Sequence, residues 1–120
     1  MKSIILFAHG SKDPLWQEPI KAIAKAIQAQ SPGVIVRCAY LEMTEPSLLE
    51  CASQLVGLGV TQMNLFPLFL GVGRHAREDL PRQAQALRQN HPHVQLRVMP
   101  SAGEMPEVVA HLAQMALKSL

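Results

Sequence analysis

Aromatic residues and cysteines are scarce in this sequence, and both shortages argue against particular functions. Phe, Trp and Tyr make up 4% of its 120 residues, so few rings are available to stack on a flavin or a nucleobase. The two cysteines, Cys38 and Cys51, form no C-x-x-C pair and have no histidine at zinc-finger spacing. We therefore expect them to be small buried side chains in a reducing compartment.

The sequence also lacks a concentration of charge and a long apolar run. Its formal net charge is +2, with both signs mixed along the chain, which argues against a nucleic-acid-binding protein. No apolar run approaches the roughly 20 residues that cross a bilayer. The N-terminal run is interrupted by His9 and Gly10, and no small-residue cleavage site follows, so no signal peptide is expected. These features predict a cytoplasmic protein that binds neither nucleic acid nor a membrane.

Strand-like and helix-like segments alternate regularly along the chain. Hydrophobic residues make up 48% of it, enough for a core, and its length fits a single domain over residues 1–120. Asp13 and Thr44 are the expected caps of the first two helices, and Gly59 suits the end of the second. Pro67 donates no hydrogen bond, so we expect it where the third strand leaves the sheet. The predicted strands are residues 3–8, 34–40, 62–70 and 94–100, and the predicted helices are residues 14–30, 44–59, 76–90 and 104–119.

This alternation predicts an α/β fold, a three-layer sandwich around a four-stranded parallel sheet in the flavodoxin-like order 2-1-3-4. In that order the first strand lies between the second and the third, and every strand-to-helix loop opens at the same edge. His9 follows the first strand, Glu42 the second and His75 the third. Because neighbouring strands are about 4.8 Å apart, we expect these three side chains to converge.

Two imidazoles and a carboxylate suit a divalent cation such as cobalt, nickel, zinc or iron, and three protein ligands leave a coordination position open. The simpler interpretation is that each residue is solvated, and Glu45 competes with Glu42 for the acidic position. The remaining histidines suit a site less well. We expect a solvated turn at His91 and His93, on the opposite edge of the sheet, and a packed or half-exposed structural residue at His111.

A Gly-rich loop with basic residues follows the third strand. Gly71 and Gly73 form a bare G-x-G that completes neither the dinucleotide-binding nor the P-loop pattern. Arg74 and Arg77 fall at a predicted helix start, where cations oppose the helix dipole. Solvated arginines and a site for a carboxylate-bearing ligand are both consistent with this pattern, and the dipole conflict slightly favours the ligand.

Three segments, ILFAHGSKDP, AYLEMTEPSL and PLFLGVGRHAREDLP, together resemble the short sirohydrochlorin cobaltochelatases of the class II chelatase family. The resemblance covers nearly the whole chain, in order and at suitable spacing. It implies insertion of a divalent cation into sirohydrochlorin for cobalamin biosynthesis, without ATP or an organic cofactor. Co²⁺ is the expected metal, with Ni²⁺ and Fe²⁺ as alternatives. It also implies a homodimer, because longer relatives carry two such lobes with the tetrapyrrole in the cleft between them.

The resemblance also assigns roles to individual residues. It implies that His9, His75 and Glu42 hold the metal and carry the catalysis, although the sequence does not separate metal delivery from removal of the pyrrole protons. Leu68, with Leu70 and Val72, suits the flat apolar ring, and the basic side chains suit its carboxylates. The implied substrate-binding residues are Ser11, Lys12, Leu70, Gly71, Val72, Gly73, Arg74 and Arg77.

Three other functions fit parts of the pattern. A non-catalytic metal-binding or metal-delivery protein would use the same histidine pair without producing a metallated tetrapyrrole. A flavodoxin-like nucleotide or flavin module shares the expected fold but needs stacking partners. A histidine phosphatase would use His9 as its nucleophile, but Ala8 stands where such sites usually have an arginine.

Overall fold

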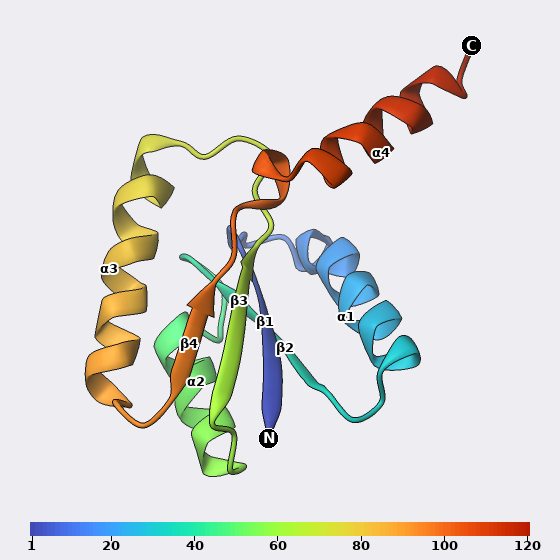
Figure 1. The fold of residues 1–120 in the computed structure, drawn as a ribbon. Helices are drawn as coiled ribbons and strands as arrows, with labels where there is room; N and C mark the ends of the chain where they lie inside the picture. The colour runs from blue at the N-terminus through green and yellow to red at the C-terminus, as the bar shows by residue number, and fades with distance from the viewer.

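A four-stranded parallel sheet forms the centre of the structure, a computed structural model that describes residues 1–120 (Figure 1). Its strands are β1 (Lys2–Ala8), β2 (Ile35–Tyr40), β3 (Gln62–Pro67) and β4 (Gln95–Val98). They lie in the order β2-β1-β3-β4, and all neighbouring pairs are parallel. The predicted strand order is confirmed, so the loops after β1, β2 and β3 leave one edge side by side.

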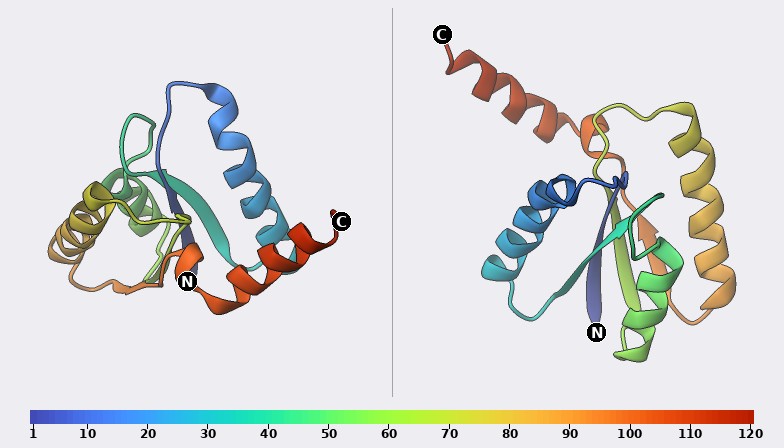
Figure 2. Two further views of the ribbon diagram at one scale, coloured as in Figure 1. Left: turned by 90° about the horizontal axis from the view of Figure 1, so that it is seen from above. Right: turned by 180° about the vertical axis from the view of Figure 1, so that it is seen from behind.

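Helices pack on both faces of the sheet. They are α1 (Glu18–Gln30), α2 (Leu48–Gly57), α3 (Arg74–Asn90) and α4 (Pro106–Leu117), with short 3₁₀ turns η1 (Pro14–Gln17) and η2 (Ala102–Glu104). Helix α1 lies against one face, and α2 and α3 lie against the other, which confirms the three layers (Figure 2). Helix α4 leads away from the sheet (Figure 1). None of these helices has the length and apolar character needed to span a membrane.

Strand β1 is buried on both faces, which explains its uninterrupted apolar sequence. Ile5 and Phe7 belong to the core beneath α2 and α3, whereas Leu6 and Ala8 pack toward α1. Because successive strand residues point to opposite faces, one short run supplies both cores. The strand is therefore held firmly up to the residue that precedes His9.

The two cysteines are free thiols, but they differ in burial. Cys51 is fully buried in the core beneath α2, whereas Cys38 is partly exposed on the α1 side. Burial raises the pKa of the Cys51 thiol to about 12, and burial also raises the pKa of Cys38 despite an opposing effect of Lys21. Cys51 therefore behaves as the expected small buried side chain.

The predicted cap of the second helix was wrong. Helix α2 begins at Leu48 rather than at residue 44, and Ser47 caps it. The Ser47 hydroxyl accepts from the Glu50 backbone N–H at 3.2 Å, and the Glu50 carboxylate accepts from the Ser47 N–H at 3.3 Å. This reciprocal capping box satisfies two N–H groups at once, and Pro46 disfavours helical conformation at the residue before it.

Other element ends shifted by a few residues. Strand β3 ends at Pro67, as expected for a residue that cannot donate to the ladder, rather than continuing to residue 70. Helix α3 begins at Arg74 instead of residue 76. The segment predicted as one helix over 14–30 is η1 followed by α1, and the Asp13 carboxylate caps η1 by accepting from the Leu15 N–H at 2.9 Å. Gly59 follows α2 with a φ of 90°, a conformation that favours glycine.

Candidate metal centre

The three residues predicted to converge lie around one cavity at the carboxyl edge of the sheet. His9 directly follows β1, Glu42 follows β2, and His75 is the second residue of α3. The cavity has a volume of about 370 Å³ and is lined by His9, Leu41, Glu42, His75 and Asp79. Two imidazoles and two carboxylates therefore surround one space, whereas the competing Glu45 is not among its lining residues.

His9 and Glu42 are in direct contact. Nδ1 of His9 lies 3.1 Å from Oε1 of Glu42, and both side chains are less than half exposed. The His9 ring also packs on the buried Phe69 ring, with the two centroids 4.7 Å apart. When Nδ1 donates to the carboxylate, Nε2 keeps its lone pair and is available to a metal, an arrangement common among metal-ligating histidines.

His75 lines the same cavity from the first turn of α3. Its side chain is exposed, and no three His, Cys, Asp or Glu side chains in the structure are close enough together to hold one ion. The structure therefore brings His9 and Glu42 into contact, and His75 lines the same cavity without joining them. Joint coordination requires the His75 side chain to adopt a rotamer directed at the pair.

Thr44 connects the two loops that carry His9 and Glu42 through hydrogen bonds of its side chain. Its hydroxyl accepts from the Ser11 N–H at 2.8 Å and donates to the Ser11 carbonyl at 2.9 Å. The Trp16 indole N–H donates to the His9 carbonyl at 2.7 Å. These bonds hold the backbone from the His9 carbonyl to Ser11, so Thr44 positions the site instead of capping a helix.

The backbone beside Glu42 is strained. Met43 has a φ of 66°, in the left-handed region, and the Thr44 N–H donates to the Glu42 carbonyl at 2.7 Å. This is a γ-turn of the rarer, strained kind. A residue other than glycine in such a conformation costs of the order of 1–2 kcal/mol, and such costs are concentrated at functional sites.

Gly10 allows these two loops to approach each other. A Cβ atom at position 10 would overlap the Glu42 carbonyl oxygen and crowd the Thr44 hydroxyl at 2.7 Å. Only glycine fits there, because the obstacle is backbone and cannot rotate away. The contact between His9 and Glu42 depends on this close approach.

We expect Gly10→Ala to separate the two loops and disrupt the His9–Glu42 contact. The unfolding free energy should fall by about 1–3 kcal/mol through overpacking, and Co²⁺ affinity should fall by about tenfold or more. Gly33→Ala is the matched control, because a Cβ there meets nothing within 4 Å. Urea unfolding and cobalt titration measure both effects. Wild-type cobalt affinity in Gly10→Ala would contradict this role.

The residues predicted to bind substrate have mixed surroundings. The Ser11 hydroxyl accepts from the Asp13 N–H at 3.1 Å, and Lys12 is exposed. Arg74 lies 3.4 Å from Glu78, and Arg77 lies 3.5 Å from the Val72 carbonyl. Leu70 is 72% exposed, and a Cβ at Gly71 or Gly73 would meet nothing within 4 Å.

A second cavity lies beside His9. It measures about 230 Å³ and is lined by Ala8, His9, Trp16, Pro19, Ile20 and Leu68. Its walls are mostly apolar, in contrast to those of the first cavity, and His9 is shared by both. Sequence reasoning proposed Leu68 as a contact for an apolar ring but did not find Trp16, which stands outside the three quoted segments.

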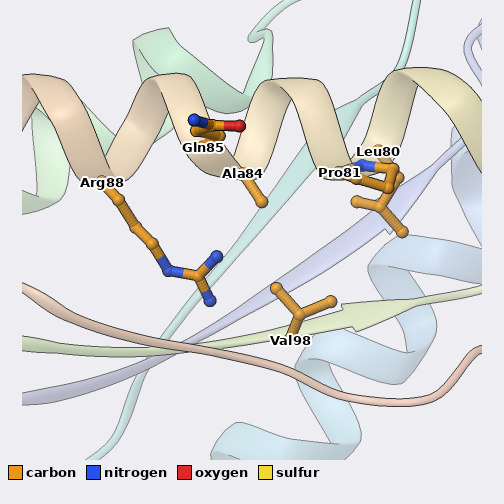
Figure 3. A pocket seen from close by; sticks show the side chains of 6 residues that line it. All are labelled: Leu80, Pro81, Ala84, Gln85, Arg88 and Val98. Carbon is orange, nitrogen blue, oxygen red and sulfur yellow. The ribbon is translucent and has the colours of Figure 1, made fainter.

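The largest cavity lies away from these residues. It has a volume of about 430 Å³ between α3 and β4, and Leu80, Pro81, Ala84, Gln85, Arg88 and Val98 line it (Figure 3). Its one charged group, Arg88, donates to the Leu96 carbonyl at 3.1 Å. No imidazole or carboxylate lines this cavity, so it is a poorer candidate for a metal site than the cavity beside His9 and Glu42.

The remaining histidines lie elsewhere. His91 follows α3 at the opposite edge of the sheet, where its Nε2 is 3.5 Å from the Ser53 hydroxyl, and His93 is exposed in the same turn. His111 is exposed on α4, so it does not pack in the core, because no residue of α4 is buried.

Asp79 is the charged lining residue that sequence reasoning missed. It follows His75 by four residues, and residues four apart lie on the same face of a helix. The four-residue spacing of His75 and Asp79 therefore predicts that both lie on one face of α3. Arg74 and Arg77 were considered as binding residues in this segment, and no role was assigned to Asp79.

The sequence and the fold of this chain match those of known proteins. A model of the CbiX family matches residues 3–119. The sirohydrochlorin cobaltochelatase of Methanosarcina barkeri is 38% identical over 79 residues, which are 66% of this chain and 61% of that protein. The matched part of the chain thus spans less than two thirds of that relative's length.

Two solved structures share the fold. A protein from Marinobacter aquaeolei VT8, assigned to CbiX of cobalamin (vitamin B12) biosynthesis, is 33% identical with a TM-score of 0.85, covering 99% of this chain and 97% of that one. The sirohydrochlorin chelatase SirB from Bacillus subtilis, in complex with cobalt, is 22% identical with a TM-score of 0.80. It covers 98% of this chain and 50% of SirB, and at that identity it shows the fold alone. The sequence match over nearly all of its length, together with this shared architecture, makes the chain a member of the CbiX family.

Proposed function

We propose that this chain catalyses ATP-independent insertion of Co²⁺ into sirohydrochlorin, with residues 1–120 acting as one chelatase lobe. The observation that carries the proposal is that His9, paired with Glu42, lines one cavity together with His75. Membership of the CbiX family and the names of the curated relatives support it. The metal is a substrate here, held by the protein and then passed to the macrocycle.

The side chains around the cavity supply the chemistry that insertion needs. The incoming cation must lose water, and the macrocycle must lose two pyrrole protons. Imidazole nitrogens suit a borderline cation that must later be released, and imidazole or carboxylate can accept a proton. His9 and His75 bind the cation, while Glu42 orients His9 through Nδ1 and is available as an acceptor.

The surroundings suit the rest of the macrocycle. The apolar cavity lined by Trp16 and Leu68 adjoins His9, and its walls match a flat apolar ring. Arg74, Arg77 and the first N–H groups of α3 offer positive potential to the substrate's carboxylates. Arg74 and Arg77 interact unfavourably with the dipole at the start of α3, and the substrate's carboxylates would offset this cost.

The choice of Co²⁺ rests on the relatives' names, since the ligand types present suit several divalent cations. Imidazole and carboxylate accept cobalt, nickel and iron alike, and affinity for Ni²⁺ generally exceeds that for Co²⁺ at such sites. Insertion of Fe²⁺ or Ni²⁺ is the alternative. Relative rates with the three metals separate these activities.

We propose further that the chain acts as a homodimer, and α4 supports this. Val108, Leu112 and Met115 form an apolar stripe along α4, and Glu107, His111 and Gln114 form a polar row beside it. No residue of α4 is buried, and Leu112 and Met115 are 45% and 56% exposed. The stripe of α4 gains stability when another surface covers it, and no surface of its own chain does so.

The sheet has an uncovered surface that fits a second copy. On the α1 side, β3 and β4 carry exposed Asn64, Gln95 and Arg97 beside the partly exposed Phe66, although parallel sheets are normally covered on both faces. Helix α4 leads away on this same side (Figures 1 and 2). Reciprocal exchange of α4 between two copies would cover both surfaces at once.

We place this activity in the cytoplasm. The support is that both Cys38 and Cys51 are free thiols, as expected in a reducing compartment.

We expect the wild-type chain, mixed with CoCl₂ and sirohydrochlorin, to form the metallated tetrapyrrole faster than a protein-free control. The measurement is the change in the visible absorption spectrum with time, repeated with Fe²⁺ and Ni²⁺. Cobalt binding without acceleration would contradict a chelatase and favour a metal-delivery protein. A faster reaction with another metal would correct the choice of Co²⁺ alone.

A further inference from the structure

Asp79 is a second carboxylate at the metal cavity. It lies one helical turn after His75 on α3, and both residues line the same space as His9 and Glu42. Its side chain is 37% exposed, compared with 57% for the neighbouring Glu78. Asp79 is therefore turned toward the cavity more than the adjacent acid on the same helix.

The charges around this cavity are unbalanced. Glu42 and Asp79 carry two negative charges, and no lysine or arginine is among the lining residues. The cation nearest Asp79 is Arg82, whose Nη1 lies 3.4 Å from Oδ1, and its side chain is 76% exposed. An ion pair so open to solvent neutralises little, so a divalent cation is the charge complement of this space.

We infer that Asp79 is a positioning residue that docks the incoming hydrated divalent cation, an inference that rests on the proposed chelatase function. Its carboxylate accepts hydrogen bonds from water on the cation and holds it between His9 and His75 until they replace that water. A carboxylate suits this step because hard oxygen ligands bind hydrated cations well, whereas imidazole suits the later, less hydrated state.

The arrangement of α3 provides matched variants. Glu78 pairs with Arg74 at 3.4 Å, as Asp79 pairs with Arg82 at 3.4 Å, but Glu78 does not line the cavity. Asp79→Asn and Glu78→Gln thus each remove one charge and one ion pair from the same helix. Arg82→Gln removes the pair and leaves the Asp79 carboxylate in place.

We expect Asp79→Asn to weaken Co²⁺ binding about tenfold, measured with CoCl₂ by calorimetry. The KM for cobalt should rise while the KM for sirohydrochlorin stays unchanged, and Asp79→Glu should partly restore both values. Glu78→Gln should match the wild type, and Arg82→Gln should bind cobalt at least as tightly. Circular dichroism verifies that each variant is folded.

Three results would overturn the inference about Asp79 alone, given a wild-type chain that binds and inserts cobalt. These are unchanged cobalt affinity in Asp79→Asn, an equal loss in Glu78→Gln, and an equal loss in Arg82→Gln, which would indicate a structural ion pair. A wild-type chain without measurable cobalt affinity would overturn both this inference and the proposed function.

Discussion

Replacing either His9 or His75 with alanine is expected to reduce cobalt insertion to the rate of the protein-free reaction while the chain stays folded. The loss should be at least about a hundredfold, because each variant removes both a metal ligand and a possible proton acceptor. Stability should change little, since both side chains lie at the open edge of the sheet and are not in the core. Insertion is followed by visible absorbance and folding by circular dichroism.

His93→Ala is the control for these variants. His93 is an exposed histidine at the opposite edge of the sheet, so its removal should leave both insertion and folding unchanged. Wild-type rates in both His9→Ala and His75→Ala would show that the metal site is elsewhere. A loss in His9→Ala alone would leave the second histidine without its proposed role.

Placing two carboxylates on the apolar stripe of α4 is expected to convert a dimer into monomers. The variant Leu112→Glu/Met115→Glu should sediment as a monomer, because burying these two side chains contributes about 1.5–3 kcal/mol each and a buried unpaired charge is unfavourable. Insertion should fall with the dimer, since the cleft for the tetrapyrrole is proposed to form between two copies. Analytical ultracentrifugation and the insertion assay measure both effects.

Ala110→Glu/Gln114→Glu is the matched control for this prediction. It adds the same number of carboxylates to exposed positions of α4, but on the side of the helix away from the stripe. This variant should remain dimeric and active. A wild-type chain that is strictly monomeric yet active, or a charged stripe that leaves the dimer intact, would contradict the exchange of α4.

Several features of the fold were predictable from local sequence because local forces decide them. The apolar run of β1 indicated a strand covered on both faces, and Asp13 and Gly59 marked element ends through their own hydrogen-bonding and backbone preferences. Alternation of strands and helices, with right-handed crossovers, then leaves few possible strand orders. The end of β2 and the start of α2 were less predictable, because Thr44 and Ser47 are both good caps and only the tertiary contact with Ser11 separates them.

The candidate site likewise contains residues that the sequence predicts and residues that only tertiary contacts bring into it. His9, Glu42 and His75 stand out in sequence because each follows a predicted strand, and a parallel sheet brings such positions to one edge. Asp79 did not stand out, because only its position at the cavity makes it a candidate site residue. His9, Leu41 and Glu42, which line the same cavity, are distant from it in sequence. The close approach at Gly10 and the bond between His9 and Glu42 likewise depend on two loops that only the sheet brings together.

The amino-acid sequence by itself determined the order of the strands and the edge at which the histidines emerge, because hydrophobic periodicity and chain connectivity act over short stretches. The tertiary structure alone decided that His9 contacts Glu42, that Asp79 joins the cavity and that α4 leaves its own sheet uncovered. These outcomes depend on packing between segments distant along the chain, and the amphipathic pattern of α4 is the same whether it covers its own sheet or that of a second copy.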